Sequence, residues 1–235
     1  MTRFKSLVNP SSGTQPLDND APALPDAPAF SWPATYRFGG LQNLKPEEWS
    51  LNTTGMIEKP TRFVYRNILA LPQSTQERRW ISPDGWSIKA SWQGVLLEEL
   101  VKRIHPEFLR PEFLKPEFSD LGNIWINQEN AQGEKEHMLL KDLIEGKALL
   151  CHKVNGQPLP WLYGGPVALM VFDRYNYKGL GQISELCFEE TAPERPSRHK
   201  LKGYPEDGAI AAGDYYAFDL QAFRPLHGPE HFESK

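Results

Sequence analysis

Few residues in this chain combine a reactive side chain with a spacing that suits catalysis or metal binding. Cys151 and His152 are adjacent in an apolar segment typical of a strand, where neighbouring side chains point to opposite faces. We therefore expect a buried structural thiol rather than a pair that chelates one ion. His227 and His231 are four residues apart, but the glycine and proline between them would break the helix needed to present both rings on one face. We interpret these two histidines as tail residues rather than zinc ligands.

Motifs that mark other chemistries are missing from the sequence. It contains no glycine-rich loop followed by Lys-Ser or Lys-Thr, no nucleophile elbow and no His-Glu-x-x-His helix. Two cysteines are too few for a disulfide scaffold or for a four-thiolate metal site. The 26 basic and 30 acidic residues give a net charge of −4, which argues against broad binding to the phosphate backbone of nucleic acids. Spacing alone therefore predicts no active site.

The distribution of apolar residues along the sequence indicates where in the cell the protein is expected. No apolar run reaches the length of about 18 residues that a membrane span needs. The N-terminus also lacks the apolar centre of a secretory signal. We expect a cytoplasmic protein with reduced thiols and no membrane span.

Composition divides the 235 residues into three regions. Residues 1–40 are rich in proline and predict an extended N-terminal arm over a domain surface. Residues 41–190 carry the periodic apolar signals of a folded domain, and residues 191–235 return to proline, glycine and charge. The aromatic stretch at 215–218 interrupts the last region, which we expect to be a C-terminal extension packed on the domain.

The central region predicts mainly strands. Residues 86–92 alternate between apolar and polar after the turn signal Pro-Asp-Gly at 83–85. Leu96, Leu100 and Ile104 share one face of a helix expected over 95–104. Helices do not alternate regularly with strands, which disfavours a doubly wound parallel sheet and predicts a β-rich α+β domain. The other expected elements are strands at 123–128, 148–154, 167–172 and 182–188 and a short helix at 139–145 closed by Gly146.

A five-residue repeat, Pro-Glu-Phe with two further residues, runs three times through residues 106–118. A proline at every fifth position excludes a long helix, and the period matches no solenoid. The segment is either a surface loop that buries its three phenylalanines or a loop that docks a partner.

Short blocks in a fixed order extend over residues 48–190. They are Leu51–Pro60, Ser82–Ser87, Trp92–Leu97, Asn155–Pro160, Gly164–Val167 and Tyr177–Gly179, followed by a strand at Ile183–Phe188 and preceded by the short block Tyr36–Gly39. In this order the blocks resemble the molybdopterin-binding oxidoreductase domain, the fold shared by sulfite oxidases and bacterial enzymes that reduce methionine sulfoxide. The resemblance implies their β-rich mixed-sheet fold.

The resemblance implies that Ser82, Tyr163, Lys178 and Gly179 are the residues placed to hold a molybdenum–molybdopterin cofactor. Ser82 stands where the family has its single cysteine metal ligand, so it is either a serine ligand or an ordinary turn serine. A serine hydroxyl is harder and less acidic than a thiol, so a metal site would have to be rebuilt around it. Tyr163 stands at a family asparagine. Lys178 is retained, as a phosphate contact or as a solvated lysine at the start of a strand.

Two further positions depart from the family pattern. Ala168 replaces the arginine that helps to neutralise the pterin phosphate, and Gly181 replaces a second basic residue. Charge-assisted hydrogen bonds are each worth about 1.5–3 kcal/mol, so losing two weakens binding by about a hundredfold or more. Lys153 and Arg174 would offset part of this loss if they face the pocket.

Two functions from different classes follow from these residues, and they leave open whether the protein is an enzyme. The first is an oxidoreductase that carries out oxygen-atom transfer with Ser82 as the metal ligand. It would act on a small-molecule substrate or with a redox partner protein. The alternative is a cofactor-free, non-enzymatic descendant of the fold that acts as a binding or scaffold protein.

Overall fold

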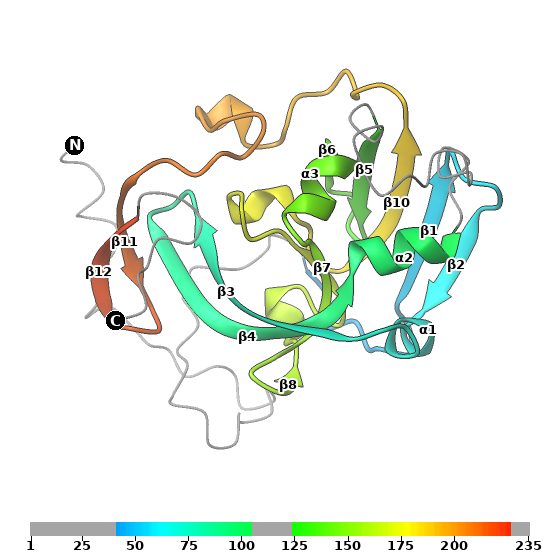
Figure 1. The fold of residues 1–235 in the computed structure, drawn as a ribbon, viewed down its shortest axis with the longest axis horizontal. Helices are drawn as coiled ribbons and strands as arrows, with labels where there is room; N and C mark the ends of the chain where they lie inside the picture. Colours follow the sequence, from blue (N-terminus) through cyan, green and yellow to red (C-terminus); the bar gives the residue numbers. More distant parts are fainter. Residues whose placement is uncertain (1–40, 105–123, 227–235) are drawn as a thin grey trace.

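A computed structural model describes residues 41–104 and 124–226, which form two β-sheets and a few short helices (Figure 1). The expected arm at 1–40, the repeat at 106–118 and the two histidines of the tail lie outside the described residues. Within the described part, no helix is both long and apolar enough to span a membrane.

The first sheet has five strands in the order β2-β1-β10-β5-β6. β1 and β10 are parallel, and the other neighbours are antiparallel. β1 and β5 alternate between a buried and a more exposed face, as expected for a sheet with one face in the core. Its strands are β1 (Ser50–Gly55), β2 (Thr61–Val64), β5 (Trp125–Asn130), β6 (Lys135–Leu139) and β10 (Ile183–Glu189).

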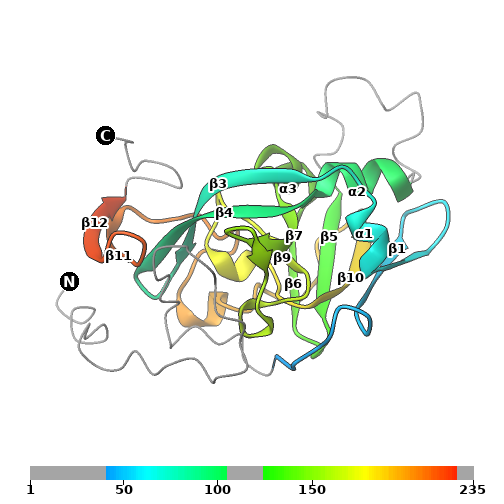
Figure 2. The same cartoon turned by 90° about the horizontal axis from the view of Figure 1, so that it is seen from below.

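The second sheet has seven strands built around the long hairpin of β3 and β4. β3 pairs with β4 along one edge, while β7 and β11 pair with different parts of its other edge. The hairpin curves away from the five-stranded sheet toward β11 and β12 (Figures 1 and 2). Its strands are β3 (Ser74–Ser82), β4 (Trp86–Leu96), β7 (Leu149–Val154), β8 (Gln157–Pro158), β9 (Ala168–Met170), β11 (Gly213–Ala217) and β12 (Ala222–Leu226).

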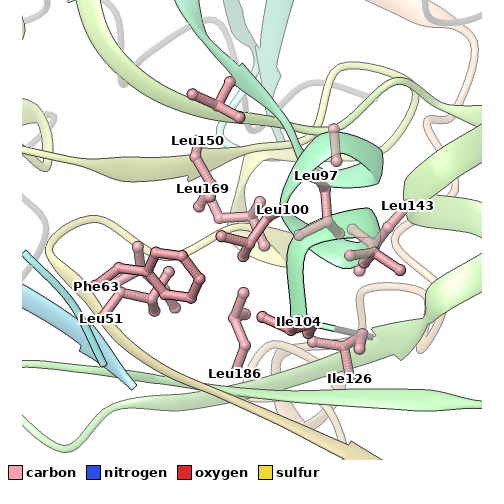
Figure 3. Packing of buried hydrophobic residues seen from close by; sticks show 14 of the residues in the cluster. Leu51, Phe63, Leu97, Leu100, Ile104, Ile126, Leu143, Leu150, Leu169 and Leu186 are labelled. Carbon is pink, nitrogen blue, oxygen red and sulfur yellow. The ribbon is translucent and has the colours of Figure 1, made fainter. Parts of the chain in front are cut away.

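The helices of the described part are all short. The longest, α2, contributes Leu97, Leu100 and Ile104 to a core shared with the five-stranded sheet (Figure 3). Its first turn is acidic and its last turn is basic, which suits the helix dipole. The helices are α1 (Tyr65–Leu69), α2 (Leu97–Ile104) and α3 (Leu140–Glu145), with 3-10 turns η3 (Trp161–Tyr163), η4 (Asn176–Lys178) and η5 (Lys200–Lys202).

The expected start at residue 95 of the helix over 95–104 is wrong. β4 continues through Val95 and Leu96, which pair with Leu150 and Leu149 of β7, and α2 begins at Leu97. Pairing with a neighbouring strand therefore overrides the helical apolar period at these two positions. The expected α+β class with mixed sheets is confirmed, because both sheets combine parallel and antiparallel pairs.

Two smaller apolar clusters complete the interior. The second core contains Trp80 of β3 and Trp86 and Trp92 of β4, together with residues of β7 and β9. The third cluster joins Ile81 to residues of η4 and of the segment that follows β10. Its buried members are Ile81, Tyr175, Tyr177, Tyr215 and Leu226.

Candidate functional site

Ser82 is the last residue of β3 and begins the turn into β4. It is buried, at 1% exposure, and its hydroxyl donates to Asp84 Oδ2 at 3.4 Å while accepting from the Asp84 backbone N–H at 3.2 Å. The Gly85 N–H closes the turn on the Ser82 carbonyl at 3.2 Å. These contacts are those of a turn-forming serine, and they direct the hydroxyl proton toward a carboxylate.

Tyr163 and Ala168 lie in the second core. Tyr163 ends η3 and is 3% exposed, and Ala168, in β9, is 1% exposed opposite Cys151 of β7. Both belong to the apolar cluster that contains Trp92 and Phe172. The structure thus brings Tyr163 and Ala168 together in one apolar cluster.

Lys178 lies in η4 and is completely enclosed. The expectation of a solvated lysine is wrong, because the side chain is 1% exposed and its ammonium contacts Glu136 Oε1 at 2.8 Å. The Glu206 carbonyl accepts a second hydrogen bond at 3.0 Å. Burial lowers the pKa of Lys178 from its usual value, and the nearby Glu136 carboxylate opposes this effect. The Gln128 side-chain amide, at 2.8 Å from the Lys178 carbonyl, holds the backbone of η4 in place.

Gly179 follows Lys178 at a point where two backbone segments touch. A Cβ at this position would lie 2.0 Å from the Leu169 carbonyl oxygen, so no other residue fits without a shift of the chain. The adjoining Leu180 carbonyl accepts a hydrogen bond from the Leu169 N–H at 2.9 Å. The close backbone contact therefore explains why residue 179 is a glycine without any ligand being involved.

Arg174 and Lys153, the two other cationic residues considered from the sequence, differ in their surroundings. Arg174 pairs with Asp173 at 2.8 Å and with Asp142 at 3.8 Å, so its charge is already matched by carboxylates. Lys153 lies in β7 and is partly exposed. At the family's second basic position, Gly181 packs so closely that a Cβ on Gly164 would lie 2.6 Å from its Cα.

Glu136 is the central residue that the sequence pattern did not identify. It lies in β6 on the inner face of the five-stranded sheet, is fully buried, and accepts from Ser197 Oγ at 2.8 Å as well as from Lys178. Next to it, His137 Nε2 lies 3.1 Å from Glu206 Oε1, and burial lowers the pKa of His137. No local motif signals this group, because its members come from segments far apart in the sequence.

An aromatic group joins the Ser82 turn to η4. His199 stacks on Tyr177 with ring centroids 4.5 Å apart, and the Tyr204 hydroxyl donates to the Pro83 carbonyl at 3.4 Å. Tyr175 and Tyr215 share a hydrogen bond of 2.7 Å between their hydroxyls. The segment after β10 therefore contacts both the turn that carries Ser82 and the turn that carries Lys178, and it crosses the top of the molecule in Figure 1.

The chemistry of this region is that of paired charges and aromatic rings. Among the described residues there is no group of three or more His, Cys, Asp or Glu side chains that could hold a metal ion. Cys151 is buried in the second core as expected, and burial raises the pKa of its thiol to about 12. Cys151 and Cys187 are both free thiols.

Curated relatives resemble this chain over part of their length. The catalytic subunit of protein-methionine-sulfoxide reductase from Xanthomonas campestris is 28% identical over 158 residues, covering 65% of this chain and 48% of the relative. The same subunit from Ralstonia nicotianae is 23% identical over 189 residues, covering 77% of this chain and 52% of that protein. The chain thus spans about half the length of the curated relatives it matches.

A solved structure and a family model agree with these relatives. The sulfane dehydrogenase SoxCD from Paracoccus pantotrophus superposes with a TM-score of 0.57 at 17% identity, over 81% of this chain and 47% of that one, which shows a shared fold. The model of the oxidoreductase molybdopterin-binding domain matches residues 38–196, including the Ser82 turn, η3, β9 and η4. The match confirms the family resemblance of the sequence blocks, and this chain belongs to the oxidoreductase molybdopterin-binding domain family.

Proposed function

We propose that this chain is a member of the molybdopterin-binding family that works without the molybdenum cofactor, as a binding or scaffold protein. The observation that carries the proposal is the buried ion pair between Lys178 and Glu136, which are 1% and 0% exposed. The one cation retained from the family's phosphate-binding pattern is thereby matched by a carboxylate of the chain itself.

The residues at this end of the site do not fit the cofactor phosphate. A phosphate near Lys178 would also lie near the buried Glu136 carboxylate, and two like charges at close range in a poorly solvated place repel strongly. Ala168 lies in an apolar core and Gly181 carries no side chain, so neither supplies a compensating positive charge.

The residues at the metal end do not fit either. To bind a metal as strongly as a thiolate does, Ser82 would have to lose its hydroxyl proton. That hydroxyl faces the Asp84 carboxylate at 3.4 Å, and a negative neighbour disfavours the formation of an alkoxide. No other side chain that binds soft metals is near in sequence, since the cysteines are at 151 and 187.

A second candidate function is that of an oxidoreductase with the reaction class of the family, oxygen-atom transfer. It would act on a small-molecule substrate or together with a redox partner protein. It is favoured by the position of Ser82, which is buried at the head of the β3–β4 turn, inside the region that the family model matches. In that case the cofactor would supply the redox chemistry, and Ser82 would be its attachment to the protein.

Metal and pterin analysis distinguishes the two functions. The full chain is produced in a molybdate-fed host that makes the cofactor, and molybdenum and released oxidised pterin are measured on the same sample. A methionine-sulfoxide reductase catalytic subunit produced in the same host is the positive control. We expect less than a tenth of an equivalent of each. Near-stoichiometric molybdenum and pterin would contradict the cofactor-free function, and Ser82→Ala should then lose the metal while remaining folded.

A further inference from the structure

The Glu136 carboxylate is surrounded by hydrogen-bond donors. Its Oε1 accepts from Lys178 Nζ at 2.8 Å and from the His137 backbone N–H at 2.9 Å. Its Oε2 accepts from Ser197 Oγ at 2.8 Å and from the Arg198 backbone N–H at 3.3 Å. An ammonium, a hydroxyl and two backbone amides are the donors with which proteins bind free anions. The fully buried carboxylate therefore occupies a complete anion-binding set of donors.

These donors come from separate parts of the chain. Lys178 belongs to η4, whereas Ser197 and Arg198 follow β10 and lie just beyond residue 196, where the family match ends. One carboxylate on β6 thus connects the family domain to the segment that follows it. Because all of its contacts are buried or partly buried, water does not replace them readily.

The same segment encloses Lys178 from the other side. The Glu206 carbonyl accepts from its ammonium at 3.0 Å, and the Gly208 carbonyl accepts from the Tyr175 N–H at 2.7 Å. A Cβ on Gly208 would lie only 2.3 Å from Lys178 Cγ, so the backbone of the segment rests directly on the lysine stem. Residues 197–208, which we call the strap, therefore contact both the charge and the aliphatic part of Lys178.

We propose that Glu136 is an internal anion: its carboxylate fills an anion site formed by Lys178 and the strap, and this occupancy fastens the strap over η4. The inference rests on the proposed function in one respect, since it names what occupies the retained lysine in place of a phosphate. The chemical class that the donors accept is a small carboxylate or another compact anion.

Shortening the side chain tests whether the donors form an anion site. Glu136→Ala removes a methylene and a carboxylate, the same heavy-atom set as acetate, so acetate should enter the vacated position. We expect the melting temperature to fall by roughly 10 °C because the ammonium of Lys178 loses its buried partner. Sodium acetate should restore at least half of this loss along a saturating curve, whereas sodium chloride at equal ionic strength and neutral acetamide should not.

A matched control is Glu129→Ala on the adjacent strand β5. Glu129 pairs with Lys135 at 2.9 Å near the surface, with 34% and 53% of the two side chains exposed. Its loss should shift the melting temperature by no more than about 2 °C and should create no response to acetate. Equal stabilisation of both variants by acetate, or none of Glu136→Ala beyond the chloride effect, would overturn the proposal.

A second pair of variants keeps the test decisive if Glu136→Ala does not fold. Glu136→Gln keeps the shape of the side chain but removes the negative charge beside Lys178, so tryptic cleavage within the strap should become at least tenfold faster than in the wild type. Adding Lys178→Met removes the buried polar group that has lost its carboxylate partner and should reverse most of this increase. Unchanged cleavage in Glu136→Gln, or no recovery in the double variant, would contradict the proposed fastening. Neither the melting temperature with acetate nor the rate of tryptic cleavage depends on metal. Molybdenum bound to the wild type would therefore overturn the proposed function but not the role of Glu136 as an internal anion.

Discussion

Arg79 and Asp219 form a two-pronged ion pair, with Nη1 2.8 Å from Oδ1 and Nη2 2.7 Å from Oδ2, although 140 residues separate them. Arg79 lies in β3, and Asp219 lies in the turn between β11 and β12. Asp219 Oδ1 also accepts from the Lys89 N–H at 3.2 Å, and Arg79 donates to Ser87 Oγ at 3.1 Å. This pair thus fixes the β11–β12 hairpin against β3 and β4.

Removing the carboxylate of this pair should destabilise the fold. Asp219→Ala removes the carboxylate that contacts both terminal nitrogens of Arg79, whose side chain is 5% exposed, and we expect a loss of about 1–3 kcal/mol in the free energy of unfolding. The measurement is urea unfolding followed by tryptophan fluorescence. As a control, Glu98→Ala breaks an exposed helical pair with Lys102 and should cost less than about 0.5 kcal/mol. Equal losses in the two variants would contradict the structural role of Arg79.

The two thiols should differ sharply in reactivity. Cys151 is fully buried, and burial raises the pKa of its thiol to about 12, whereas Cys187 is only partly buried. Because the thiolate is the reactive form, we expect one equivalent of thiol to react with a chromogenic disulfide reagent in the native protein and two in urea. Cys187→Ser should abolish the native reaction and leave one equivalent in urea. A native reaction that survives this substitution would show that Cys151 is accessible.

His199 should make the protein less stable in mild acid. Burial, with smaller effects of Arg198 and Lys202, lowers the pKa of His199 to about 4 from an ordinary value of 6.5. Between these two values the unfolded chain binds the proton more readily, so this stability is present above pH 6.5 and is lost as the pH falls toward 4. The expected loss is on the order of 1–3 kcal/mol.

A single substitution isolates this effect from the other titrating groups. His199→Phe keeps a ring in place to stack on Tyr177 but carries no proton in this range. Urea unfolding at pH 7.5 and pH 4.5 should show a smaller difference between the two pH values for the variant than for the wild type. The same difference in both proteins would refute a contribution from His199.

Local patterns predicted the parts of the fold that depend on neighbours in sequence. The alternation at 86–92 and the turn at 83–85 correspond to β4 and to its hairpin with β3, and the apolar segment at 182–188 corresponds to β10. β6 was not expected because it begins Lys-Glu-His, and only its register against β5 makes it a strand. Pairing between strands is a property of the assembled sheet that a single sequence does not display.

The contacts of the candidate site were harder to predict from the sequence than the strands. The family blocks located Ser82, Tyr163, Lys178 and Gly179, yet nothing in their spacing indicated that Lys178 would meet Glu136, which lies 42 residues away. The carboxylate faces inward on β6 because strand side chains alternate, and that strand had not been predicted. A buried polar pair of this kind depends on tertiary packing and leaves no local periodicity.

Introducing the family's residues at positions 82 and 168 should destabilise the fold and should not restore binding of the cofactor. Ala168 is 1% exposed in the apolar cluster with Trp92 and Phe172, so Ala168→Arg would bury a cation and overfill the core. We expect a fall of about 10 °C or more in melting temperature, whereas Ser82→Cys, which weakens only the turn contacts to Asp84, should cost a few degrees. The combined variant, produced in the cofactor-competent host, should bind less than a tenth of an equivalent of molybdenum. A stable double variant with stoichiometric metal and pterin would mean that the pocket persists in this chain, and that its side chains at 82 and 168 alone had prevented binding.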